Sequence, residues 1–166
     1  MPGYVPPGSS QVARLLLGSP GYAVGWQEPL YLANPAAGSE WTHTVDGRWF
    51  ERLLAVRYVL TTSAVVANRS ARLALANADG KHVLAVPATG LVAAGTTVTV
   101  HLTAGAPAFA SGTTGVSDGY LPDLMVPSGW TWHMNTAGLD VGDTETGIVL
   151  LVQRYMNDAA EITAAG

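Results

Sequence analysis

Residues 48–62, RWFERLLAVRYVLTT, carry the clearest alternation of apolar and polar positions in this chain. From Leu54 to Leu60 the even positions are apolar, while Glu51 and Arg57 fall at odd positions. Because successive side chains of a strand point to opposite faces, the pattern predicts a strand with its even face in a core. It places Glu51 and Arg57 on the outward face. The expected core row is Leu54, Val56, Tyr58 and Leu60.

Similar short segments, separated by turn-forming residues, follow along the chain. Asp79-Gly80 gives a strong hairpin signal between two of them. Pro122 confines one segment to a sheet edge because proline cannot donate to a ladder. The nearly continuous apolar run at 146–156 predicts a central strand covered on both faces. The expected strands are 41–45, 48–62, 71–77, 82–86, 96–103, 120–126, 130–136 and 146–156.

Eight short strands and no long amphipathic helix predict an all-β fold. The economical architecture is an eight-stranded antiparallel β-sandwich, jelly-roll-like, with an extended N-terminal arm. An immunoglobulin-like sandwich is the alternative. Residues 104–118 are small and polar enough to form a long loop. We therefore expect three parts, which are an arm at 1–40, a β-sandwich domain at 41–156 and a flexible C-terminal tail at 157–166.

The arm at 1–40 contains six of the ten prolines. Proline removes backbone donors, so we expect no regular structure there beyond at most one helical turn at 11–17. Large apolar side chains nevertheless recur in it, and they must cover either the chain's own sandwich or another chain. The candidate interface residues of the arm are Tyr4, Leu15, Leu16, Leu17, Tyr22, Trp26 and Tyr31.

Composition narrows the possible partners. Charged residues make up 12% of the chain, the net charge is −4 and Lys81 is the single lysine. Such a chain offers no basic surface, so we expect it to bind no nucleic acid. Without an apolar run of about 20 residues it is not expected to span a membrane. The absence of cysteine excludes disulfides, thiolate metal sites and cysteine nucleophiles.

Residues that could carry chemistry form no recognisable constellation. The acidic stretch at 140–145 lacks the twelve-residue pattern of a calcium loop and is interpreted as a polar turn. No Gly-x-Ser-x-Gly elbow is present, and no carboxylate pair lies in an apolar setting. We therefore expect no enzyme activity, no metal and no cofactor. Four histidines, none at a ligand-like spacing from another, are interpreted as solvated or rim residues: His43, His82, His101 and His133.

Trp130 and Trp132 allow two interpretations. Residues two apart lie on the same face of a strand, so a core position explains both side chains. An exposed pair would instead suggest sugar stacking, as in a host-glycan-binding adhesin module. The core interpretation is favoured, and the glycan hypothesis remains as an alternative.

Three motifs in residues 41–156, LTT…ANR, LP.L..P.GW and TAGL..GD…LLV, occur in an order that resembles small β-sandwich virion proteins of tailed bacteriophages. The resemblance implies a non-enzymatic structural protein, either a capsid decoration (cement) protein or a neck or tail component. It further implies a protein made in the host cytoplasm and located on the virion, with the capsid surface favoured. The implied partners are the major capsid protein or other virion proteins and further copies of the chain, with a trimer as one arrangement.

Overall fold

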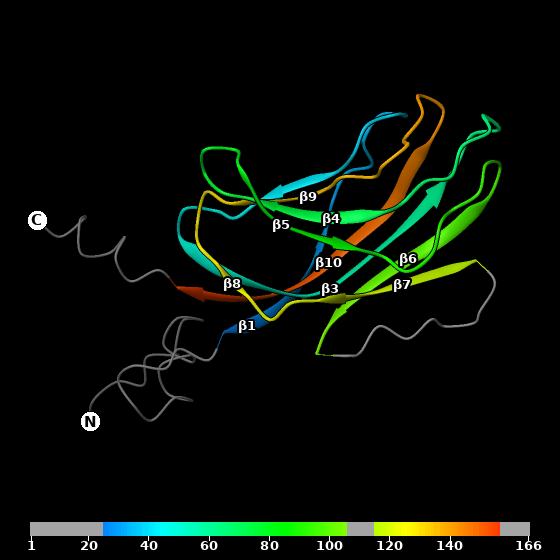
Figure 1. Ribbon diagram of the computed structural model, residues 1–166. Helices are drawn as coiled ribbons and strands as arrows, with labels where there is room; N and C mark the ends of the chain where they lie inside the picture. The colour runs from blue at the N-terminus through cyan, green and yellow to red at the C-terminus, as the bar shows by residue number, and fades with distance from the viewer. Residues whose placement is uncertain (1–24, 106–114, 157–166) are drawn as a thin grey trace, which may run out of the picture.

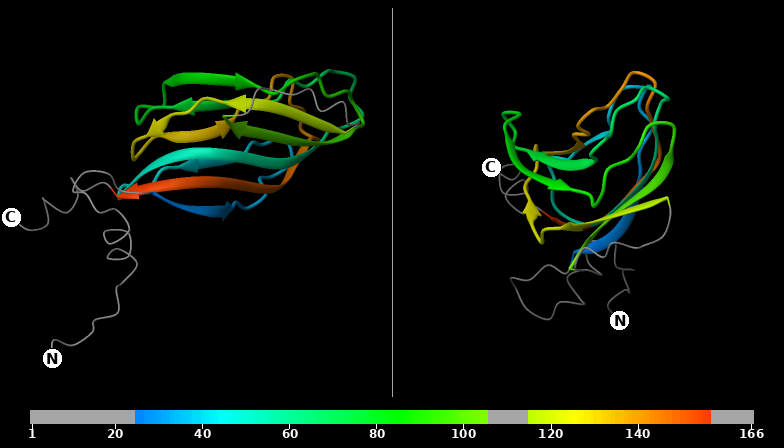
Figure 2. Two further views of the ribbon diagram at one scale, coloured as in Figure 1. Left: turned by 90° about the horizontal axis from the view of Figure 1, so that it is seen from below. Right: turned by 45° about the vertical axis from the view of Figure 1, so that its right-hand side comes forward.

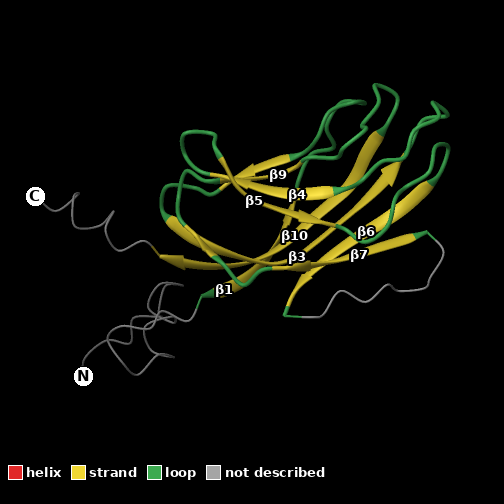
Figure 3. Cartoon of the chain, viewed as in Figure 1, coloured by secondary structure: helices red, strands yellow, loops and turns green. Residues whose placement is uncertain are grey.

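A computed structural model describes residues 25–105 and 115–156 of the chain. These residues form ten strands joined by turns and loops (Figures 1 and 3). They contain no helix that could span a membrane. The strands are β1 (Trp26–Tyr31), β2 (Thr42–Thr44), β3 (Trp49–Thr61), β4 (Arg72–Ala76), β5 (His82–Pro87), β6 (Thr97–Ala104), β7 (Val116–Leu121), β8 (Met125–Val126), β9 (Thr131–Met134) and β10 (Thr144–Met156).

Two sheets face each other across one core (Figure 2). The six-stranded sheet has the order β1-β10-β3-β6-β7, with β8 also paired to β3, and the four-stranded sheet has the order β2-β9-β4-β5. The predicted all-β two-sheet sandwich is therefore confirmed. The predicted count of eight strands was too low, and the expectation of purely antiparallel pairing was wrong because β6 and β7 run parallel.

The core is made by alternate residues of the facing strands. On β6, Val100 and Leu102 are fully buried, whereas Thr97 and Thr103 are exposed. Burial of such apolar side chains stabilises the fold by roughly 2 kcal/mol each. The largest fully buried apolar or aromatic side chains are Leu53, Tyr58, Leu60, Leu73, Leu75, Leu102, Leu121, Trp132, Met134, Ile148 and Leu150.

The alternation on β3 changes phase at Leu54, which corrects the prediction for Glu51. Ala55 pairs with Leu151 and Leu53 pairs with the next residue, Val152, so β3 holds one extra residue at this point. Such a β-bulge moves every later side chain to the other face. Arg57 is exposed as predicted, but Glu51 is fully buried and Leu54 only partly so.

Part of the predicted arm belongs to the sandwich. Trp26–Tyr31 forms β1 and pairs antiparallel with β10 along its whole length. Pro29 is tolerated because β1 lies at the edge of its sheet. The domain boundary at residue 40 was therefore wrong for residues 26–31. Five of the arm's candidate interface residues, Tyr4, Leu15, Leu16, Leu17 and Tyr22, lie outside the described residues.

The segment after β6 also differs from its prediction. Val116–Leu121 forms the edge strand β7, so the expected loop at 104–118 ends three residues too late. Parallel neighbours need a crossover connection of about a dozen residues, so no tight turn can join β6 to β7. Pro122 ends β7, which lies at the sheet edge as predicted, and the short β8 then pairs with β3.

Strand register defines two ends of the sandwich (Figure 1). Trp26, Arg154 and Glu51 lie side by side at one end, where β1 begins and β10 finishes. The connections at 32–41, 62–71, 88–96 and 135–143 gather at the other end. We call this second region the four-loop end.

Candidate functional site

A buried arginine organises the four-loop end. Arg69 has no exposed surface, and its guanidinium donates two bonds to Asp143, from Nε to Oδ2 at 2.9 Å and from Nη2 to Oδ1 at 3.0 Å. It also donates to the Ser63 hydroxyl at 3.0 Å and to the backbone carbonyls of Val65 and Ala67. A planar fork with five donors suits this pattern, and it fixes the path of the β3–β4 loop.

Hydrogen bonds also occupy both oxygens of the Asp143 carboxylate. Besides the two bonds from Arg69 it accepts the backbone N–H of Ser63 at 2.7 Å and that of Asp140 at 2.8 Å. Burial would raise the pKa of Asp143, but the hydrogen bonds from Arg69, Ser63 and Asp140 outweigh burial and lower it to about 2. The 140–145 stretch is therefore a structural turn whose two aspartates hold neighbouring loops.

Backbone bonds join all four loops into one unit. Arg69 and Val92 exchange bonds of 2.9 and 2.8 Å between their N–H and C=O groups. Ser70 exchanges two bonds of 3.0 Å with Ala137, and the N–H of Gly38 donates to the carbonyl of Asp143 at 2.8 Å. The four-loop end is consequently held together by hydrogen bonds across every pair of neighbouring loops.

The four-loop end exposes four large apolar side chains, together with the polar residues Asn34, Ser39, Asn68 and Thr96. Val66 is 95% exposed, Val141 84%, Leu91 65% and Val65 55%. Exposed alanines surround them: Ala36, Ala37, Ala64, Ala67 and Ala93. Of the charged side chains in these loops, Arg69 and Asp143 are fully buried, whereas Glu40 and Asp140 are partly exposed and bonded to neighbouring loops. Arg72, which follows the 62–71 loop, is exposed. Exposed apolar residues gathered at one site indicate a contact surface.

An acidic cluster lies behind these loops, between the sheets. The Glu145 side chain is fully buried, and one of its oxygens accepts the backbone N–H of Trp41 at 3.2 Å. Burial raises the pKa of Glu145 to about 7, the Trp41 bond lowers it and the nearby Glu40 carboxylate raises it again. The Tyr58 and Thr136 hydroxyls lie close by but make no well-aligned hydrogen bond.

A second charged network lies at the opposite end of the sandwich. Glu51 on β3 accepts a bond from Arg154 of β10 at 2.8 Å and lies 2.7 Å from the His43 ring of β2. Arg154 also bonds Glu28 of β1. Burial would raise the pKa of Glu51, but the His43 and Arg154 contacts lower it below its usual value. Because His43 belongs to the four-stranded sheet, this network ties the two sheets together.

Of the four histidines, His82 and His133 lie close together, and the other two lie apart from them and from each other. His43 bonds Glu51, and the His82 and His133 rings lie 4.9 Å apart on the four-stranded sheet. That pair comes from β5 and β9, and no sequence spacing indicated it. Among the described residues no group of three or more His, Asp or Glu side chains could hold a metal ion.

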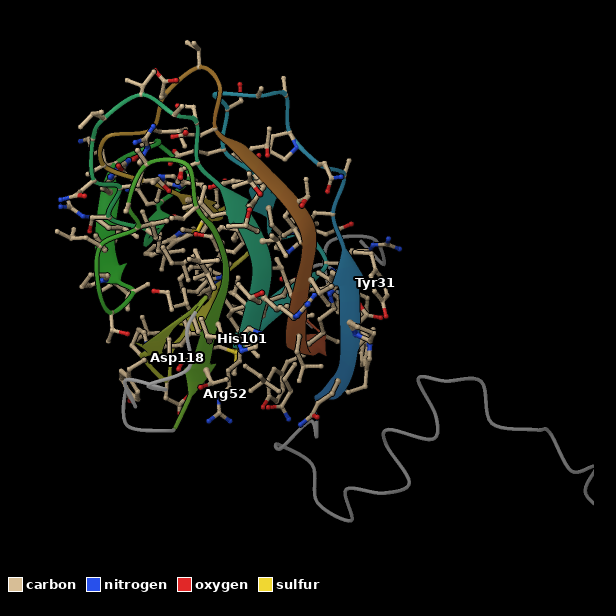
Figure 4. All side chains as sticks on the ribbon, turned by 90° about the vertical axis from the view of Figure 1, so that its right-hand side faces the viewer. Tyr31, Arg52, His101 and Asp118 are labelled. Atoms are coloured by element: carbon tan, nitrogen blue, oxygen red, sulfur yellow. The ribbon has the colours of Figure 1, made fainter. Side chains whose placement is uncertain are left out.

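The fourth histidine lies on the outward face of the six-stranded sheet. The register aligns Tyr31, Val149, Arg57, His101 and Asp118 in one row across β1, β10, β3, β6 and β7. His101 lies beside Asp118, with 4.0 Å between Nδ1 and Oδ1, while Tyr31 is at the far edge (Figure 4). The run at 146–156 is a central strand as predicted, but Val149 and Leu151 are only partly buried, so the prediction of two covered faces was wrong.

The aromatic candidates divide between core and edge. Trp132 is 1% exposed and Trp130 packs against the core, so the core interpretation is confirmed and an exposed tryptophan pair is excluded. Trp26 is 39% exposed and meets the Trp49 ring edge to face at 4.6 Å. Tyr31 is 77% exposed at the sheet edge. Sequence reasoning missed Arg69, and the available signal was a lone charge in the otherwise uncharged loop SAVVANRS.

Comparison with known proteins adds little to this geometry. No family model matches the chain. A search of curated proteins likewise finds no match. Among solved structures, the structure of infectious bursal disease virus Gt strain aligns at 14% identity and a TM-score of 0.33, over 81% of this chain and 31% of that chain. The chain thus spans about a third of the chain it matches, and a likeness this weak carries no argument about function.

Proposed function

We propose that this chain is a non-enzymatic structural protein of a tailed-bacteriophage particle, with the role of a capsid decoration (cement) protein. The observation that carries the proposal is the four-loop end. There the buried Arg69–Asp143 pair holds the loops by hydrogen bonds, while four large apolar side chains are exposed: Val65, Val66, Leu91 and Val141. A surface of this kind offers protein contact.

Two further features support the proposal. The sequence motifs in residues 41–156 resemble small virion proteins of tailed phages. In addition, β1 joins residues 1–24 to the sandwich at the end opposite the four-loop end. A body with contact regions at both ends can bridge neighbouring subunits, and many weak contacts in a repeated lattice give strong attachment through avidity.

The glycan-binding alternative is not carried forward. It required Trp130 and Trp132 to form an exposed platform, and Trp132 is fully packed in the core. A side chain in that position cannot stack on a sugar without unfolding β9.

Purified particles of the phage that encodes this chain test the proposal. We expect the chain in the particle at a fixed ratio to the major capsid protein, and we expect particles lacking it to lose DNA at a lower temperature. Cross-links to the major capsid protein would distinguish a head position from a neck or tail position. Absence of the chain from purified particles would refute the structural role.

The part of the chain that attaches can be tested by a deletion that spares β1. A variant lacking residues 1–24 retains Trp26–Tyr31, so it should keep the β-type circular dichroism of the full chain. If the N-terminal segment anchors the protein, this variant should bind particles lacking the chain at least tenfold more weakly. Undiminished binding would limit attachment to the sandwich.

A further inference from the structure

The four-stranded sheet brings two histidines together across an intervening strand. His82 on β5 pairs with Ala76 of β4, and His133 on β9 pairs with Ala74 of the same strand. Since β4 lies between β5 and β9, the two histidines meet diagonally across it. Both β4 residues are alanines, so no large side chain separates the imidazole rings, and the ring centroids lie 4.9 Å apart.

The pair lies on the outward face of this sheet. Trp132 and Met134, the neighbours of His133 on β9, are fully buried, so strand alternation directs His133 away from the core. The His133 side chain is half-buried, and His82 is exposed. A small ion can therefore reach both rings from solvent.

We propose that His82 and His133 together bind a divalent transition-metal ion of the Ni²⁺, Cu²⁺ and Zn²⁺ class, each through one ring nitrogen. Imidazole suits these ions, whereas Ca²⁺ and Mg²⁺ prefer oxygen ligands. No third His, Asp or Glu of the described residues joins the pair, so water fills the remaining coordination positions. The inference departs from the sequence-based expectation of no metal, and it does not depend on a role in a virus particle.

The spacing of the rings fits a shared ion. A metal ion about 2.1 Å from a ring nitrogen, in line with its lone pair, lies about 3.2 Å from the centre of that ring. Centroids 4.9 Å apart then subtend an angle of about 100° at the ion. This angle falls between the values of about 90° for octahedral and about 109° for tetrahedral coordination. The ring planes are tilted by 58°, so the rings are not stacked in parallel and a lone pair of each can be directed to one point.

The surroundings of His133 favour the form that binds metal. Burial and the nearby His82 lower the pKa of His133, and a hydrogen bond to the backbone of Thr131 only partly offsets them. His133 is therefore neutral at pH 7 and keeps a free lone pair. The bond to Thr131 also orients the ring, as backbone carbonyls do for histidine ligands in metal sites.

A bound ion would fasten an edge of the sandwich. β5 is an edge strand whose ladder partner is β4 alone. A metal shared by His82 and His133 would join β5 directly to β9. Because the ligands come together only in the fold, the ion should bind the folded chain in preference to the unfolded chain and stabilise it.

Calorimetric titration of the full chain with NiCl₂ at pH 7.5 tests the proposal, on protein without a histidine tag. We expect one ion per chain with a dissociation constant on the order of 100 µM. His82→Ala and His133→Ala should each weaken binding at least tenfold. The matched control is His101→Ala, which also removes one of the four histidines but lies on the other sheet, and it should leave binding unchanged. CuCl₂ should bind more tightly than NiCl₂, and MgCl₂ should not bind.

Thermal unfolding gives a second readout. At a Ni²⁺ concentration ten times the dissociation constant, the melting temperature of the wild type and of His101→Ala should rise by about 4 °C. The melting temperatures of His82→Ala and His133→Ala should not respond. Circular dichroism verifies that each variant is folded, and His82→Ala, at an exposed residue, keeps the test valid if His133→Ala fails to fold.

Three results would overturn the inference. The wild type could bind no Ni²⁺ or Cu²⁺ at concentrations up to about 1 mM. Binding could persist unchanged in either His82→Ala or His133→Ala, which would show that the two rings do not share the ion. An equal loss in His101→Ala would show that the ion binds surface histidines without preference.

Discussion

At the scale of single residues, the buried Arg69 side chain holds in place a loop that exposes apolar side chains. Its guanidinium donates hydrogen bonds to Asp143, Ser63 and two backbone carbonyls, and these bonds hold the loop that carries Val65 and Val66. Removing one partner of such a buried pair is far more costly than replacing both, because a lone buried charge remains.

Arg69→Met is accordingly expected to lower the free energy of unfolding by about 3–5 kcal/mol, since it leaves the Asp143 carboxylate buried without its partner. The double variant Arg69→Met/Asp143→Leu should lose less. Arg57→Met, at an exposed arginine on β3, is the matched control and should change stability by less than about 0.5 kcal/mol. Urea unfolding at pH 7 measures all three, and equal midpoints for the two single variants would contradict the assignment.

Glu145 makes the stability of the fold depend on pH in the opposite direction from Asp143. Its pKa is 4.5 in its unperturbed state and about 7 in the fold. Between these values the folded chain binds a proton that the unfolded chain has lost, so stability falls as pH rises from about 4.5 to 7. Asp143, with its pKa lowered to about 2, loses its contribution only as pH falls below about 4.

Glu145→Gln removes the first of these dependences because the amide stays neutral. Relative to the wild type, this variant should gain about 2.5 kcal/mol of unfolding free energy between pH 5 and pH 8. Chemical unfolding of both proteins at four pH values in this window measures the difference. Parallel stability curves would show that Glu145 is not the buried acid responsible.

At the scale of elements, β1 and β3 show how pairing overrides local pattern. Residues 26–31 contain a proline and follow a glycine-rich segment, yet they complete the sheet because β10 offers an open edge. On β3, the bulge at Leu54 turns Glu51 inward, where Arg154 and His43 neutralise it. In both cases the neighbouring strand decides the outcome.

A deletion series measures the contribution of β1. Removing residues 1–31 takes away Leu30, which packs against the core, and the Trp26–Trp49 contact. We expect a loss of about 3 kcal/mol, which lowers the melting temperature by about 9 °C, together with aggregation through the freed edge of β10. Removing residues 1–24 is the control and should leave the melting temperature within about 2 °C of the wild type. Equal melting temperatures for both deletions would contradict the role of β1.

At the scale of the whole molecule, the two ends of the sandwich carry different kinds of side chain. One end carries exposed charges in its turns and a charged network that ties the two sheets through Glu51. At the other end, Arg69 and Asp143 are buried and paired, and valine, leucine and alanine side chains are exposed. We propose contacts at the four-loop end because of this difference. Burying an apolar surface is most favourable in free energy when no charged group must lose its hydration at the same time.

The sequence by itself determined the all-β class, seven of the ten strands to within about two residues, and the apolar rows of β6 and β9. Those features depend on side-chain alternation and turn chemistry, which are local. The tertiary structure decided the strand status of β1, the parallel pairing of β6 with β7, the inward turn of Glu51 and the Arg69–Asp143 pair. Residues 69 and 143 are 74 positions apart, and neither a bulge nor a long-range ion pair leaves a periodic signal, so only the packing of strands and loops could bring these groups together.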